Sequence, residues 1–280
     1  MNILRIAFVT LREMSRRKLV IAAFALTLVT ALLTGWGFYA LVHQTQHGRP
    51  IAHAQVLAST AFMIVMLGYM FNLIFALAGA FVAAPALAGD IETGLLLPIA
   101  TRPVRRSEIV LGKFAGILVM LCAYAYFAGI IEFAIARAVT GYWPPHPVVA
   151  LASLCGVGIT MLALTLLLSS RMAAIAGGVT AVVLYGLAWI GGIIGDIGMQ
   201  VHSVGFANAG TVSQLILPSD AFWRAAAFHL EPVAMLIGIG SHATPFAVAA
   251  PPPLPMMLWG VGWIVVMLAL ACWSFTARDL

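Results

Sequence analysis

Residues 19–42 read LVIAAFALTLVTALLTGWGFYALV, a run of 24 residues that contains no Asp, Glu, Lys or Arg. A helix needs about 20 apolar residues to cross the hydrocarbon core of a bilayer. Five further runs are long enough to span, and they lie at residues 56–87, 114–136, 148–168, 173–195 and 256–275. The sequence therefore predicts an all-α polytopic membrane protein with six transmembrane helices, folded as a single domain over residues 1–280.

The composition excludes a soluble globular protein. Apolar residues make up 63% of the 280 positions, and charged residues only 8%, against about a quarter in an ordinary soluble domain. The three cysteines fall singly in three different apolar runs. They therefore form neither a disulfide framework nor a metal-binding pair.

The chain begins with a basic amphipathic segment over residues 2–18, in which apolar residues at helical spacing alternate with five Arg and Lys residues. Such a helix lies along a membrane surface, where its basic face meets lipid headgroups. A signal peptide also begins with positive charge, but its apolar region is only about 7 to 15 residues long. We therefore expect an interfacial helix followed by a retained first span.

The distribution of Lys and Arg predicts the orientation, because cytoplasmic loops carry the excess of positive charge. With the N-terminus inside, 11 of the 14 Lys and Arg residues are cytoplasmic, and only Arg49, Arg137 and Arg224 lie outside. We predict that both termini are cytoplasmic and that the protein resides in the plasma (inner) membrane.

Residues 196–255 are expected to form a long extracytoplasmic segment, which we interpret as interfacial or re-entrant helices. Ser219 is expected to cap a helix that Pro232 closes. An apolar face on that helix is expected to lie in the outer interface. The face comprises Phe222, Trp223, Ala226, Ala227 and Leu230.

No enzyme motif is present. Gly112 and Lys113 are followed by Phe114 instead of the Ser or Thr of a phosphate-binding loop, and Ser107 stands where its first glycine should be. Asp196 follows Gly195 as in an intramembrane aspartyl centre, but a helix end that reaches water explains it better, since no second membrane aspartate is available. We expect no catalytic residue, bound cofactor or metal in this chain.

Glu132 is the one ionisable residue that we place inside a span. It could mark an ion or proton pathway, but we favour a boundary acid that reaches the outer interface together with Arg137. All seven histidines fall on the predicted outer side, and His43 and His47 share a helix face. We expect no tight metal site there, because carboxylate and thiolate ligands are missing nearby.

Small residues four apart allow helices to approach closely. Three such pairs occur, at Gly112 and Gly116, Gly156 and Thr160, and Gly191 and Gly195. Packing within one subunit explains them, and a dimer contact is an equally open second use of the glycine-rich fifth span.

The most informative stretch is the polar loop at residues 88–113. Residues 89–98 read GDIETGLLLP, and residues 100–113 read ATRPVRRSEIVLGK. Ser107 and Glu108 are suited to the start of the next helix. A plain connector has no reason to expose three consecutive leucines unless lipid or a partner covers them. The loop therefore presents a short helix and a basic patch to something in the cytoplasm.

This stretch resembles the membrane-spanning permease subunit of type-2 ATP-binding-cassette (ABC) exporters. That family joins its second and third spans by an acidic-Thr-Gly segment, a small-Arg-Pro bend and an Ile-x-x-Gly-Lys helix start, which here are residues 90–94, 101–103 and 109–113. The interfacial helix, the six spans and the inserted segment before the last span also agree, so the resemblance covers essentially the whole chain.

The resemblance implies that residues 90–108 form a coupling helix that docks on a separate ABC ATPase subunit. It also implies a homodimer, or a heterodimer with a similar subunit, that works among membrane lipids and has no nucleic-acid partner. ATP and Mg²⁺ would bind to the ATPase. The expected coupling residues are Asp90, Glu92, Thr93, Gly94, Leu95, Leu96, Arg102 and Pro103.

Two other classes stay open from the residues alone. An ATP-independent carrier or channel would need buried ion-binding groups, which are scarce here. A membrane scaffold would use the same loop only for docking. Among exporters, the sequence does not choose between lipids, drugs, glycans and the copper- or sulfur-handling maturation systems.

Overall fold

The computed structural model describes residues 3–15, 18–46, 49–92, 105–231, 248 and 250–277. Six helices in this part of the chain are long and apolar enough to cross a membrane, which confirms the predicted number. They are α2 (Lys18–Val42), α3 (His53–Ala84) with its continuation, α6 (Arg106–Thr140), α7 (Pro147–Ser169), α8 (Ala174–Gln200) and α12 (Leu254–Thr276).

Shorter elements complete the described fold. The chain starts with α1 (Ile3–Ser15), and two short helices, α9 (Val204–Ile216) and α10 (Ser219–Leu230), follow α8. Two-residue strands β1 (Thr45–Gln46) and β2 (Arg49–Pro50) pair antiparallel between α2 and α3. Pro147 is the first residue of α7 and Pro255 is the second residue of α12, and in the first turn a proline removes no helical hydrogen bond.

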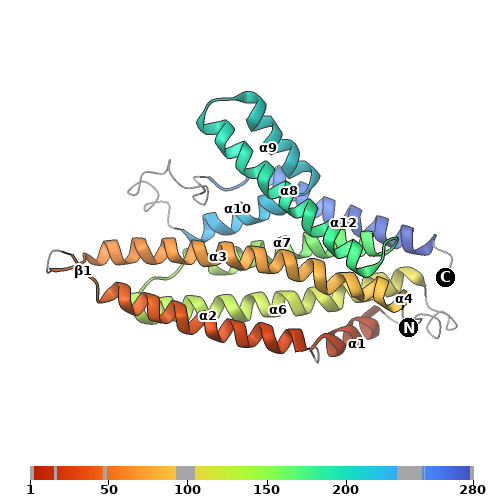
Figure 1. Ribbon diagram of the computed structural model, residues 1–280, viewed down its shortest axis with the longest axis horizontal. Helices are drawn as coiled ribbons and strands as arrows, with labels where there is room; N and C mark the ends of the chain where they lie inside the picture. The colour runs from red at the N-terminus through yellow and green to blue at the C-terminus, as the bar shows by residue number, and fades with distance from the viewer. Residues whose placement is uncertain are drawn as a thin grey trace.

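Helices α2, α3, α6 and α7 run side by side along the long axis of the molecule, whereas α8 and α9 form a hairpin that projects obliquely from them (Figure 1). Both termini lie at the end of the molecule near α4, which we call the termini end, and β1 lies at the opposite end. An even number of spans requires this placement of the two termini.

Helix α7 is the centre of the bundle. In its most apolar stretch 78% of the residues are buried, against 17% for α2, because α3, α6, α8, α10 and α12 all pack on it. The peripheral helices leave large apolar side chains exposed, such as Leu32 on α2 and Val265 on α12. Helices that are apolar on all sides are stable in contact with lipid. The exposed apolar side chains of the peripheral helices therefore fit an integral membrane protein.

The second and third spans extend further than the sequence predicted. Helix α3 passes through a π-helical turn, η1 (Pro85–Gly89), into α4 (Asp90–Glu92), which makes a continuous segment of 40 residues. At 1.5 Å per residue this is roughly 60 Å, about twice the hydrocarbon thickness. Part of this segment must therefore lie outside the bilayer or tilt strongly.

The predicted polar loop at residues 88–113 is correspondingly shorter. Its first residues belong to η1 and α4, and α6 already begins at Arg106 with Arg105 as its N-cap residue. Ser107 and Glu108 lie in the first turn of α6, so the expected helix start is confirmed, although the N-cap position itself belongs to Arg105 and not to Ser107. Charged side chains made the spans look shorter than the helices are.

The glycines of the predicted close-approach pairs pack within this chain. A Cβ on Gly116 would lie 2.7 Å from the carbonyl oxygen of Ala7, so this glycine seats α1 on α6. A Cβ on Gly195 would lie 2.9 Å from the Cα atom of Gly210, so this one seats α9 on α8. Packing inside the subunit is confirmed at both places, because any side chain there would separate the helices.

Helix α10 does not present its apolar face to a membrane interface. It packs on α7 and α3, and the side chains that we expected at the interface are buried in the protein core. Ser219 is the first residue of α10 and not its cap, since Pro218 occupies the N-cap position. The helix ends at Leu230, and the predicted stop at Pro232 lies outside the described residues.

Candidate functional site

A group of polar contacts joins α6 to η1 and α4, the continuation of α3, toward the termini end of the bundle. The Lys113 ammonium donates to the carboxylate of Asp90 and to the carbonyl oxygen of Ala86. We call these three residues the clamp. The π-helical turn makes Ala86 available, because a wider turn disturbs the regular ladder of backbone hydrogen bonds. Lys113 is only 8% exposed, so the clamp is part of the packed interior.

Further polar contacts join the other helix ends in this region. The Ala174 amide, at the start of α8, donates to Glu92 Oε1 over 3.0 Å, where the helix dipole also favours a negative charge. Arg171 Nε donates to Ser274 Oγ over 2.9 Å and so ties the end of α7 to α12. The residues on both sides of the 93–104 segment are therefore fixed to the rest of the bundle.

The predicted coupling residues divide into two groups. Asp90 and Glu92 are described, lie together in α4 and bind groups of this chain, Lys113 and Ala174 respectively. The remaining residues lie outside the described part of the chain, and they are Thr93, Gly94, Leu95, Leu96, Arg102 and Pro103.

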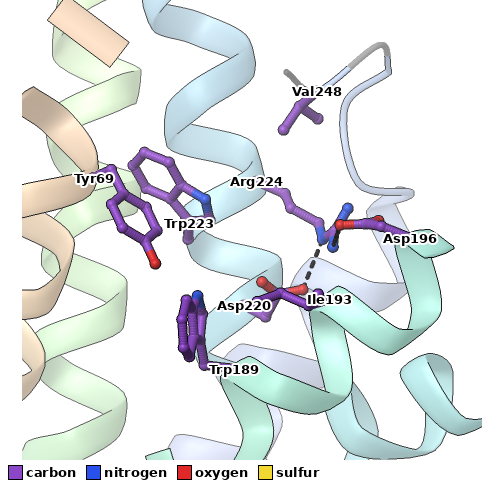
Figure 2. A pocket seen from close by; sticks show the side chains of 8 residues that line it. All are labelled: Tyr69, Trp189, Ile193, Asp196, Asp220, Trp223, Arg224 and Val248. Carbon is purple, nitrogen blue, oxygen red and sulfur yellow. Dashed lines mark hydrogen bonds and ion pairs between the residues drawn. The ribbon is translucent and has the colours of Figure 1, made fainter. Parts of the chain in front are cut away.

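A cavity of about 260 Å³ lies between α3, α8 and α10. Its walls differ, as Figure 2 shows: three aromatic rings gather on one side, and an ion-pair cluster lies on the other. The aromatic rings belong to Tyr69, Trp189 and Trp223; the Tyr69 ring centroid is 5.4 Å from that of Trp223 and 6.4 Å from that of Trp189. Each ring comes from a different helix, so only the folded chain forms this wall.

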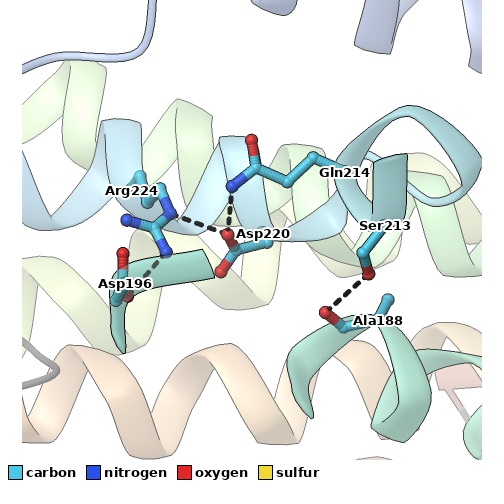
Figure 3. Close-up of polar contacts among 6 residues, drawn as sticks. All are labelled: Ala188, Asp196, Ser213, Gln214, Asp220 and Arg224. Atoms are coloured by element: carbon cyan, nitrogen blue, oxygen red, sulfur yellow. Dashed lines mark hydrogen bonds and ion pairs between the residues drawn. The ribbon is translucent and has the colours of Figure 1, made fainter. Parts of the chain in front are cut away.

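The ion-pair cluster consists of Asp196, Asp220 and Arg224, which we call the cavity cluster. Arg224 Nε donates to Asp220 Oδ2 over 2.7 Å, and Arg224 Nη2 donates to Asp196 Oδ2 over 2.8 Å (Figure 3). The Gln214 amide also donates to Asp220 Oδ2, over 2.8 Å. Burial alone lowers the pKa of Arg224, but the hydrogen bonds and charges of Asp196 and Asp220 outweigh it and raise that pKa above its ordinary value.

One of these positions contradicts its sequence prediction. Asp196 is not a helix end in water, because α8 continues to Gln200 and Asp196 holds Arg224. Arg224 serves as the shared partner of two acids besides any effect on orientation. Asp220 and Arg224 are four residues apart on α10, a spacing that favours an ion pair, so that half of the cluster was visible in the sequence.

Glu132 and Arg137 do not reach the outer interface together. Glu132 is 1% exposed and accepts a hydrogen bond from Thr34 Oγ1 over 2.6 Å, whereas the Arg137 guanidinium lies 5.3 Å from the ring centroid of Trp143. Five residues along a helix turn the side chains about 140° apart, which explains why the pairing is wrong. Glu132 is thus a buried acid at a contact between α6 and α2.

The other candidate ligands form no cluster in the described part of the chain. No group of three or more His, Cys, Asp or Glu side chains there could hold a metal ion. The His43 ring packs on the Tyr39 ring with centroids 4.1 Å apart. His47, which we expected on the same helix face, lies outside the described residues. The three cysteines are free thiols.

Comparison with known proteins agrees with this architecture. The family model described as "ABC-2 family transporter protein" matches residues 4–280. No curated protein matches the chain at a significant level. The family match covers nearly the whole chain and includes the clamp, the cavity cluster and all six apolar helices. The protein therefore belongs to the ABC-2 transporter family, as an integral membrane permease subunit and not as an enzyme.

Proposed function

We propose that this permease is the membrane subunit of an exporter that a separate ABC ATPase subunit drives from the cytoplasm. ATP and Mg²⁺ bind to that partner, and this chain forms the substrate path with a second copy or with a similar subunit. The family match supports partnership with an ABC ATPase. The excess of Lys and Arg in the 1–18 and 102–113 segments supports cytoplasmic termini in the plasma (inner) membrane.

The observation that carries this proposal is the anchoring of the helices on both sides of the 93–104 segment. On one side Glu92 holds the start of α8, and on the other side Lys113 holds α6 to Asp90. Arg106 Nη1 also donates to the Thr276 carbonyl oxygen over 3.4 Å, which brings in α12. A force applied at Glu92 or at Arg106 would therefore reach α8 and α12 directly through these contacts.

Helix α8 connects this region with the cavity. It begins at the Glu92 contact and carries Trp189 and Asp196, which line the cavity. Its 27 residues correspond to about 40 Å of helix. An ATPase that binds one position of the segment more tightly than another would shift α8, and with it the cavity, between two conformations. Energy supplied in the cytoplasm is thereby used at the substrate path.

A series of Glu92 variants tests the coupling. Co-expression with the ATPase, followed by co-purification and vesicle ATP hydrolysis, gives the two measurements. Glu92→Lys places a positive charge beside the start of α8 and should uncouple hydrolysis from transport. Glu92→Gln keeps an acceptor oxygen for the Ala174 amide and should stay close to wild type, whereas Glu92→Ala should fall in between.

The same series separates two roles of Glu92. If the ATPase recognises its charge directly, Glu92→Gln will lose as much ATPase binding as Glu92→Lys. Leu96→Asp tests the expected apolar anchor in the same assay, and neutralising Arg105 alone should matter less. Normal ATPase binding and coupled hydrolysis in both Glu92→Lys and Leu96→Asp would contradict the proposal, as would transport that continues without ATP.

A further inference from the structure

The cavity combines an aromatic wall with an excess of negative charge. Two carboxylates, Asp196 and Asp220, share the single guanidinium of Arg224. Among the described residues that line the cavity, Arg224 is the one cation. The described lining residues therefore carry a formal charge of −1, in a partly buried place where charges are weakly screened.

An aromatic wall beside a net negative charge favours an organic cation as the bound group. Aromatic faces carry negative potential and attract a cation placed within about 6 Å of the ring centroid, most strongly when it is a weakly hydrated organic cation. Tyr69, Trp189 and Trp223 offer three such rings, and Asp220 lies close to them (Figure 2). The Asp220 carboxylate is seated against the backbone of α8, because a Cβ on Gly192 would lie only 3.0 Å from its Cγ.

Other occupants fit less well. An anion would meet the net negative lining, and Arg224 already uses Nε and Nη2 for the two aspartates. Ca²⁺ and Mg²⁺ take six or more oxygen ligands, whereas most of this wall is aromatic or aliphatic. A volume of about 260 Å³ is below the usual range for drug-sized ligands. The cavity therefore suits a compact group and not a whole large molecule.

We propose that this cavity binds the ammonium group of an organic cation, either a free small cation or the head of a lipid or other amphiphile. That this cation is also the transported substrate rests on the proposed exporter function. That the cavity binds it rests on the cavity residues alone. Trp189 is 39% exposed, so one wall can be reached from outside the fold.

The test uses three water-soluble probes of nearly the same shape and different charge. Choline carries +1, 3,3-dimethyl-1-butanol is uncharged, and 3,3-dimethylbutanoate carries −1. Binding to the purified full-length permease, in an uncharged maltoside detergent, is measured by calorimetry and by tryptophan fluorescence. We expect choline to bind about tenfold more tightly than the alcohol, and the carboxylate to bind most weakly. Equal affinities, or tightest binding of the carboxylate, would overturn the proposal.

Matched variants locate the binding. Trp189→Leu removes one ring of the aromatic wall, whereas Trp259→Leu removes an exposed tryptophan that hydrogen-bonds to the Leu215 carbonyl outside the cavity. Choline affinity should fall several-fold in the first variant and stay unchanged in the second. Asp220→Asn cancels the charge excess and should reduce the preference for choline over the alcohol. Thermal unfolding of each variant is measured, and an equal loss in both Trp variants counts against this cavity.

A fourth probe distinguishes the two sources of the ammonium group. Glycerophosphocholine that binds as well as choline assigns the cavity to a lipid headgroup, and weaker binding assigns it to a free cation; both results keep the ammonium assignment. Because the measurement needs no ATPase, its failure is distinct from failure of the exporter proposal, which co-purification decides. Choline binding that survives both Trp189→Leu and Asp220→Asn unchanged would overturn the proposal.

Discussion

The clamp and the cavity cluster are two polar groups inside an apolar bundle, and they differ in charge balance. In the clamp, Lys113 meets one carboxylate and one backbone carbonyl, so its charge is compensated. In the cavity cluster, Arg224 meets two carboxylates and leaves one negative charge in excess. A compensated ion pair joins two helices, whereas an uncompensated negative charge beside a cavity favours binding of a positively charged ligand.

The largest expected effect comes from breaking the clamp. Lys113→Met removes the cation and leaves Asp90 and the Ala86 carbonyl without their partner, which should cost about 3 kcal/mol of stability. The free energy of unfolding, measured by titration with dodecyl sulfate in mixed micelles, gives this value. The double variant Lys113→Met with Asp90→Asn removes both charges and should recover part of the loss. If the double variant is no more stable than the single one, the clamp is not a charge pair.

A smaller effect is expected when one carboxylate is neutralised in the cavity cluster. Asp196→Asn leaves Arg224 paired with Asp220 and cancels the excess charge, so the stability cost should be about 1 kcal/mol, the size of one hydrogen bond. The same micelle titration compares it with Lys113→Met. A cost for Asp196→Asn as large as that for Lys113→Met would show that the two clusters play the same structural role.

The smallest effect concerns the glycine that seats Asp220. Gly192→Ala would place a Cβ 3.0 Å from the Asp220 carboxylate, so that side chain must move by a few tenths of an ångström, at a cost of about 0.5 kcal/mol. Gly186→Ala is the matched control on the same helix, because a Cβ there would meet nothing within 4 Å. Choline affinity should drop slightly in Gly192→Ala and not in Gly186→Ala. Equal affinities in the two variants would mean that the position of Asp220 does not matter.

The ion-pair partners of Lys113 and Asp196 could not be predicted from the sequence. The sequence predicts Lys113 in a loop and Asp196 at a helix end, because a charge in an apolar run normally marks the boundary of a span. In the folded chain both carry partners from distant segments: Asp90 is 23 residues from Lys113, and Arg224 is 28 residues from Asp196. A partner that distant cannot be inferred from local spacing.

The same reasoning applies to α10. Its apolar face was visible in the sequence, but the choice between lipid and protein as its neighbour was not, since both are apolar. The structure places Phe222 against Gly156 of α7, where a Cβ would lie only 2.5 Å from the ring. The absence of a side chain at Gly156 decides that contact, and its use by α10 is apparent only in three dimensions.

The sequence by itself determined the six apolar helices, the amphipathic start and the resemblance to ABC-2 permeases, because length, hydropathy and a local motif are properties of neighbouring residues. Apart from Asp220 and Arg224, whose spacing of four residues favours a pair, only the tertiary structure decided which charged residues are paired and which rings share a cavity. The rings of Tyr69, Trp189 and Trp223 come from three helices, and their meeting depends on how side chains from α3, α8 and α10 fill the space between those helices, since packing is a property of the whole fold and not of any one segment.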